Sequence, residues 1–127
     1  MPDWKQRLRQ AFEADGQPWR QDAWDTLLHH CKKAGVRIAM HTDHPVIHQK
    51  WLRLCAAMAM HYGLPEEEAL KTVTLNPAII ARVGDRIGSI ERGKDAELIV
   101  LDGDPLALTS NVQYVISSGR VVVTPEN

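Results

Sequence analysis

The chain has 127 residues, of which 44% are hydrophobic and 24% charged, a size and composition typical of one folded domain rather than a disordered segment. Fifteen basic and 16 acidic residues leave a net charge of -1, which gives no electrostatic basis for binding nucleic acid or an anionic membrane. Charges interrupt the apolar residues near the start, so we expect neither a secretory leader nor a membrane span. Small molecules and other proteins remain as partners.

The two cysteines indicate a reducing compartment. Cys31 and Cys55 lie in segments with helical spacing, and they form neither a CxxC pair nor a set with nearby metal ligands. Reduced thiols are therefore the better interpretation, and they favour a cytoplasmic location.

The first half of the chain begins with two predicted helices, over residues 2–14 and 22–34. Gly35 ends the second helix. The following run, VRIAMHT at 36–42, is short, apolar and β-branched, which predicts a buried parallel strand. Asp43 then lies at the C-terminal end of this strand.

Helical patterns continue up to Gly84. Residues 49–62 predict a helix with apolar or small residues on nearly every face, which needs cover on both sides. Pro65, in a first helical position before three glutamates, begins a helix through about Val73. Asn76 is a capping residue followed by proline, so it should begin a further short helix.

After residue 84 the sequence changes to short apolar runs separated by glycines, which predicts a sheet. We place a domain boundary there, between residues 1–84 and 85–127. The last two predicted strands form a hairpin around Ser118 and Gly119. The expected strands are 97–101, 112–117 and 120–124.

This set of elements is incomplete by itself. A parallel strand needs partners at both edges and helices over both faces, and the sequence predicts a single such strand. Three C-terminal strands likewise make only a marginal sheet. We therefore expect either that strands come from another chain or that the protein associates with itself.

Three stretches resemble the imidazolonepropionase-like branch of the amidohydrolase superfamily, in the family's order. They are HTDHPV at 41–46, AAMAMHYGLPEEEALKTVTLNPA at 56–78 and DRIGSIERGKDAELIVLDGDPL at 85–106. The resemblance implies an α/β fold: the last β/α unit of a (β/α)8 barrel, meaning strand 8 and the following helices. The C-terminal strands would belong to the family's composite β-sandwich. As a single chain, this fold is incomplete.

The resemblance also implies a role for Asp43. In that family the aspartate ending strand 8 binds a divalent metal, takes a proton from the metal-bound water and passes it to the leaving nitrogen. The resemblance thus makes Asp43 both a catalytic residue and a metal ligand, with zinc the expected ion in the intact enzyme and an amide or cyclic amide the substrate. His44 is the expected substrate-binding residue. The plainer alternatives are a turn carboxylate for Asp43 and a loop histidine bonded to backbone for His44.

The family's other ligands, an HxH pair, a bridging lysine or glutamate and two single histidines, have no counterpart in this sequence. Zinc sites take at least three protein ligands, so we expect this chain alone to bind no metal and to be inactive. Met1 would then be a fragment boundary. One alternative is a non-catalytic interaction or oligomerisation module that docks with a separate N-terminal half through the edge of 36–42. Another is a metal site of its own, using His41, which strand alternation places beside Asp43, together with His44.

Overall fold

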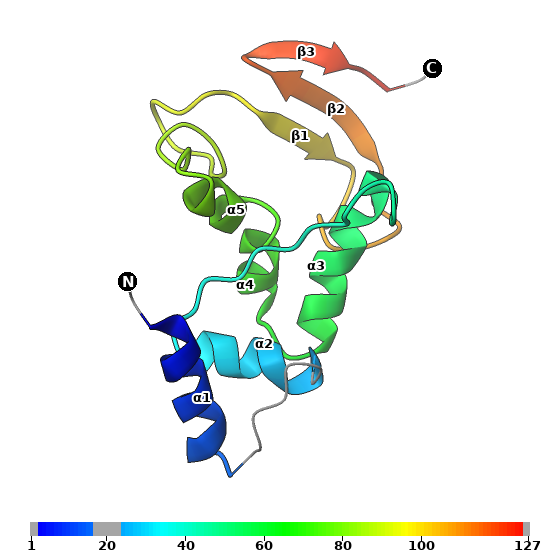
Figure 1. The fold of residues 1–127 in the computed structure, drawn as a ribbon. Helices are drawn as coiled ribbons and strands as arrows, with labels where there is room; N and C mark the ends of the chain where they lie inside the picture. Colours follow the sequence, from blue (N-terminus) through cyan, green and yellow to red (C-terminus); the bar gives the residue numbers. More distant parts are fainter. Residues whose placement is uncertain (1–2, 17–23, 126–127) are drawn as a thin grey trace.

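The computed structural model describes residues 3–16 and 24–125, which form a helical part followed by a small sheet (Figure 1). The first residue of the predicted helix 2–14 and the first two of the helix 22–34 lie outside the described residues. No described helix is long and apolar enough to cross a membrane. The elements in chain order are α1 (Trp4–Ala14), α2 (Trp24–Lys33), the 3-10 helix η1 (Gln49–Trp51), α3 (Leu52–His61), α4 (Glu66–Lys71), α5 (Leu75–Ile80), β1 (Leu98–Leu101), β2 (Val112–Ser117) and β3 (Arg120–Val123).

Helix α1 packs against α2 through a small apolar cluster. Asp3 begins α1, because its carboxylate accepts a backbone N–H of the first turn at 3.0 Å. Leu8 and Phe12 are buried to 2% and 1% exposure and share a cluster with Cys31 of α2. The Phe12 ring also stacks on His30, with 3.8 Å between the ring centroids. Burial in this cluster raises the pKa of the Cys31 thiol, as expected for a packed, reduced cysteine.

Polar contacts at the end of α1 complete its attachment to α2. Lys33 forms an ion pair and hydrogen bond with Asp15, which lowers the pKa of the Asp15 carboxyl. The buried His30 places its Nε2 atom 3.2 Å from the same carboxylate. Asp15 therefore joins the C-terminal end of α1 to two side chains of α2.

The main core cluster includes residues from both halves of the chain. Arg53 of α3 also connects the helices to the part of the chain after β1, because it donates hydrogen bonds to the carbonyls of Ser110 at 2.7 Å and Pro105 at 3.5 Å. Alanines in the cluster let α3 approach α4 closely. The buried members are Leu28, Ala56, Ala59, Leu64, Ala69 and Leu106. The segment after β1 thus packs against the helical part, so the core contains residues from before and after the predicted boundary at residue 84.

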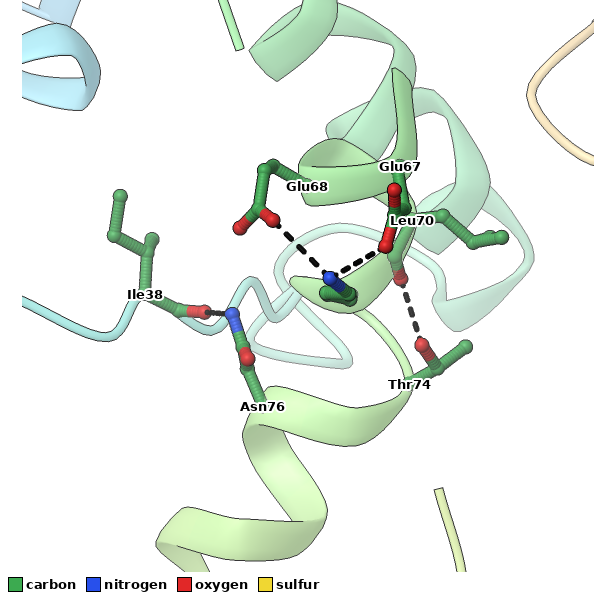
Figure 2. A network of polar contacts seen from close by, with 7 residues as sticks. Ile38, Glu67, Glu68, Leu70, Thr74 and Asn76 are labelled. Atoms are coloured by element: carbon green, nitrogen blue, oxygen red, sulfur yellow. Dashed lines mark hydrogen bonds and ion pairs between the residues drawn. The ribbon is translucent and has the colours of Figure 1, made fainter. Parts of the chain in front are cut away.

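Helix α4 begins with three glutamates, where the helix dipole favours negative charge. Pro65 is the cap residue of α4, so the helix begins at Glu66 and not at Pro65 as predicted. The ammonium of Lys71 is 2.7 Å from Glu67 and 3.1 Å from Glu68, the two glutamates labelled in Figure 2. These contacts lower the pKa of Glu67 and raise the pKa of Lys71.

The predicted role of Asn76 as a helix cap is wrong. Helix α5 begins at Leu75, Thr74 is its cap residue, and Asn76 lies inside the helix. The side-chain amide of Asn76 instead donates a hydrogen bond to the carbonyl of Ile38 at 2.8 Å (Figure 2). A contact across 38 residues of sequence takes the place of the local bond that a cap would make. Asn76 therefore fixes the position of the segment that contains Ile38.

The long loop between α5 and β1 packs closely against α5. The backbone of Gly88, with φ of +93°, lies so close to the end of α5 that an added Cβ would be 2.7 Å from the Ala78 Cβ. Lys94 is largely buried, and its ammonium donates to the Gly84 carbonyl at 2.7 Å. The loop is thus held against the helical part.

The three strands form an antiparallel sheet in the order β1-β2-β3, which confirms the predicted strands and their hairpin. Ser118 and Gly119 connect β2 to β3 with φ values of 50° and 77°, the two positive values of a type I′ turn. The register shifts once within each strand pair, and β1 and β3 form the two edges. Together with the helices this gives the predicted α/β class, and the sheet fits the expected composite-domain strands.

The predicted strand at 36–42 is not formed. This segment runs from α2 toward α3 without helix or strand (Figure 1). Within residues 3–16 and 24–125 its backbone groups make only three hydrogen bonds: Val36 N–H to Cys31, Met40 N–H to Thr72 and the Ile38 carbonyl to Asn76. The physical reason is that no other described segment lies beside it as a strand, so it has no ladder to join.

Candidate functional site

Asp43 lies in an exposed turn directly after this segment. Its backbone has φ of 53°, and its carbonyl accepts the Val46 N–H at 2.9 Å, which closes the turn. Its own N–H donates to the Nδ1 atom of His41 at 3.1 Å. In the described chain the carboxylate of Asp43 makes no hydrogen bond. The turn therefore fixes the backbone of Asp43 and leaves both carboxylate oxygens available to a ligand.

His41 stabilises a conformation that non-glycine residues seldom adopt. A positive φ is unfavourable for an L-residue, and the bond from the Asp43 amide to the imidazole offsets part of this strain. Because Nδ1 is the acceptor, it carries no proton in this arrangement, and Nε2 is the donor nitrogen of His41. Strand alternation predicted that His41 and Asp43 lie on one side of a strand. In the structure the contact between them is the hydrogen bond from the Asp43 N–H to the His41 ring.

His44 follows Asp43 into the same turn, and its ring contacts a second histidine. The peptide bond between His44 and Pro45 is cis. The rings of His44 and His48 meet edge to face, with 5.2 Å between centroids, and both residues are exposed. His48 accepts the Lys50 N–H at 3.2 Å, the same i to i+2 contact that His41 makes. The contact between His44 and His48 was not anticipated, since it depends on the path of the turn.

The side chains around Asp43 do not fit a metal ion. Among the residues that the structure describes, no group of three or more histidine, cysteine, aspartate or glutamate side chains is placed to hold one. His41 uses Nδ1 for a backbone contact, and the His44 ring packs against His48. A stable zinc site needs at least three protein ligands in tetrahedral positions. The residues that the structure describes therefore do not by themselves supply the donor set of a metallohydrolase.

A calorimetric titration of the purified chain with zinc is expected to show no saturable binding in the micromolar range. The physical reason is that one carboxylate and scattered histidines lose too much conformational entropy in converging on an ion. The Asp43→Asn variant is the matched control, since both proteins should give the same weak heats. A one-to-one isotherm that disappears in the Asp43→Asn variant would contradict this expectation.

A groove of about 350 Å³ lies beside the segment 36–42, not at the turn. Asn76 and Thr72 line its helical side, and Arg37 and Ile38 line the other. The lining residues do not include Asp43. The groove therefore lies between the segment and the helices that carry Thr72 and Asn76, separate from the carboxylate of Asp43.

We next compare the chain with known proteins. Residues 26–124 match the sequence pattern described as the Amidohydrolase family. The chain is 36% identical over 84 residues to an N-substituted formamide deformylase of Arthrobacter pascens, covering 58% of this chain and 16% of that protein. It is 35% identical over 75 residues to an imidazolonepropionase of Porphyromonas gingivalis, covering 54% of this chain and 18% of that protein. The chain thus spans less than a fifth of the length of these two relatives.

A solved structure shows the same relation in three dimensions. An amidohydrolase from Thermotoga maritima superposes with a TM-score of 0.77 and 36% sequence identity. The match covers 96% of this chain but only 35% of that chain. Nearly all of the fold described above therefore has a counterpart in that protein, and most of that protein has no counterpart here.

Proposed function

Because this chain belongs to the amidohydrolase family and is similar to imidazolonepropionases, we propose that it forms the C-terminal part of a metal-dependent hydrolase of non-peptide carbon–nitrogen bonds. The formamide deformylase and the imidazolonepropionase support a bond of the amide or cyclic amide class. The observation that carries the proposal is the family match over residues 26–124, which includes the turn at Asp43.

In this proposal Asp43 is the catalytic residue. Hydrolysis requires a base that removes a proton from the attacking water and an acid that protonates the leaving nitrogen, and one carboxylate performs both steps in turn. The exposed, unbonded carboxylate of Asp43 suits such a proton carrier. His44, in the same exposed turn, is the proposed substrate contact, through a ring nitrogen that can bond to a carbonyl or amide.

The metal belongs to the larger enzyme in this proposal. The amidohydrolase family is generally metal-dependent, whereas the donor set of this chain does not fit an ion by itself. Asp43 would contribute one carboxylate ligand, and the other ligands would come from residues that this chain does not contain. Zinc is the ion that we propose for the complete site, and the chain alone should be inactive.

The test is an assay of the purified chain on N-substituted formamides and cyclic amides, with zinc or manganese added. We expect no turnover above that of the Asp43→Asn variant, because the ligands that activate water are missing. Robust turnover by the chain alone would refute the proposed inactivity. Genomic sequence directly upstream of Met1 supplies an independent check, since an in-frame HxH-containing stretch is expected there if the chain is one part of the enzyme.

A second function is favoured by the unpaired segment 36–42. We propose as the alternative that the chain is a non-catalytic interaction or oligomerisation module, which docks with a separate N-terminal half of an amidohydrolase through this edge. The support is that the segment has no strand partner among residues 3–16 and 24–125, while the Thermotoga maritima protein has most of its residues outside the matched part. A chain that is strictly monomeric at every concentration and binds no other subunit would contradict this alternative.

A further inference from the structure

The segment 36–42 has the side-chain pattern of a strand, although no other described segment pairs with it. Val36, Ile38 and Met40 are partly buried, and they pack against the two core clusters. Of the intervening residues Arg37 and His41 are exposed, whereas the small Ala39 is partly buried. Alternation of this kind is the mark of an extended chain with one face on the core. The segment is therefore already placed as a strand on the helices beneath it.

The hydrogen bonds show which edge of this strand is open. In an extended chain the backbone N–H and C=O of one residue point to the same edge, and those of the next residue point to the opposite edge. The Ile38 carbonyl and the Met40 N–H are both bonded, to Asn76 and Thr72 of the helical layer (Figure 2 shows the first). The backbone groups of Arg37, Ala39 and His41 consequently face the other edge. In the described chain none of them makes a backbone hydrogen bond.

The other free edges of the molecule carry features that discourage pairing. The register of β3 with β2 is irregular between Val115 and Ile116, and Pro125 follows β3 closely; both features limit the addition of a further strand. The pairing of β1 is also shifted, between Val100 and Leu101. The edge at Ala39 has no proline and no bulge, and the small side chain at its centre permits close approach of another backbone.

We propose that this edge binds a second copy of the chain, with the two segments antiparallel about a twofold axis at Ala39. Each Ala39 then faces its equivalent, and each Arg37 faces a His41. The three facing pairs all present their N–H and C=O groups to one another, and each pair of this type exchanges two hydrogen bonds. A twofold interface is self-complementary, so one contact satisfies the open edges of both copies at once.

The charges are compatible with this pairing. Arg37 is the only lysine or arginine of the segment, and the axis places it opposite His41 rather than opposite another arginine. The whole chain has a net charge of only -1, so long-range repulsion between copies is small. The inference develops the oligomerisation alternative above and is independent of the hydrolase proposal, because it makes no use of the Asp43 carboxylate.

Sedimentation of the full chain tests the pairing. From low micromolar to near-millimolar concentration, the average mass is expected to rise from 14.3 kDa toward twice that value. Ala39→Pro removes the N–H that each copy donates at the axis, and it is expected to raise the dimer dissociation constant about 10- to 100-fold. Ala39→Val keeps the N–H at the same position and should leave the dimer intact. A mass that stays at 14.3 kDa, or a dimer dissociation constant that is unchanged in Ala39→Pro, overturns the inference.

A cysteine at the axis gives a second measurement that does not depend on the proline variant folding. Facing residues of this pair type have Cα atoms about 5.5 Å apart, within disulfide range. Ala39→Cys should therefore oxidise rapidly to a dimer linked through the two side chains at position 39, as peptide mapping would show. Arg92→Cys, at an exposed loop position, is the control and should link slowly. Equal rates for the two variants, or a linkage elsewhere, would overturn the twofold pairing, and a monomer that binds only another amidohydrolase segment would assign the edge to that partner.

Discussion

Replacing Phe12 with alanine is expected to lower the free energy of unfolding by about 3–5 kcal/mol, the usual range for a buried aromatic side chain. Phe12 is 1% exposed, stacks on His30, and joins Leu8 to Cys31 in the cluster between α1 and α2. Its removal deletes this packing and leaves a cavity that two helices cannot fully close. Since small domains have only about 5–15 kcal/mol of stability, the variant should lose a large share of it.

Urea denaturation followed by circular dichroism would measure this effect. Trp4→Ala is the matched control, because it truncates another large aromatic residue of the same helix that is 47% exposed. We expect its effect to be a small fraction of that of Phe12→Ala. If the two variants unfold at the same urea concentration, the cluster between α1 and α2 does not stabilise the chain as described.

Replacing Gly88 with alanine should also destabilise the fold strongly, for two separable reasons. The φ of +93° is unfavourable for any L-side chain, which costs about 1–3 kcal/mol. In addition, the new Cβ would meet the Ala78 Cβ at 2.7 Å and the Thr74 carbonyl oxygen at 3.1 Å. Overpacking against such fixed atoms adds about 1–3 kcal/mol.

Gly93 supplies a close control for this substitution. Its φ is +92°, and nothing lies within 4 Å of the position of a Cβ. Gly93→Ala therefore has the conformational penalty without the clash, and the difference between the two alanine variants measures the contact of the loop with α5. Thermal or urea unfolding of both variants would show it. Equal stabilities would mean that the loop does not press on the helix.

Local patterns were sufficient to predict most of the elements. The helix at 49–62 appears as η1 followed by α3, and the hairpin forms at Ser118 and Gly119, where the turn residues favour positive φ. Its predicted strands are correct to within one residue. These features depend on residues close together in the sequence, which is why a single sequence reveals them.

The features that the sequence did not reveal depend on distant partners. The run at 36–42 has the composition of a strand, but a strand exists only when another is beside it, and no described segment supplies one. Asn76 has the composition of a cap, yet its amide bonds to Ile38. At the candidate site, the motif around Asp43 was apparent from residue types, whereas the contact between His44 and His48 depends on the turn between them.

The place of Leu106 in the main core has a consequence for the order of folding during synthesis. The other buried members of that cluster all come before residue 70, so a ribosome completes the helical half well before the leucine emerges. Until then the cluster lacks one of its buried members, and Arg53 lacks both of its carbonyl acceptors. The helical half therefore completes its core only after the segment that follows β1 has been synthesised.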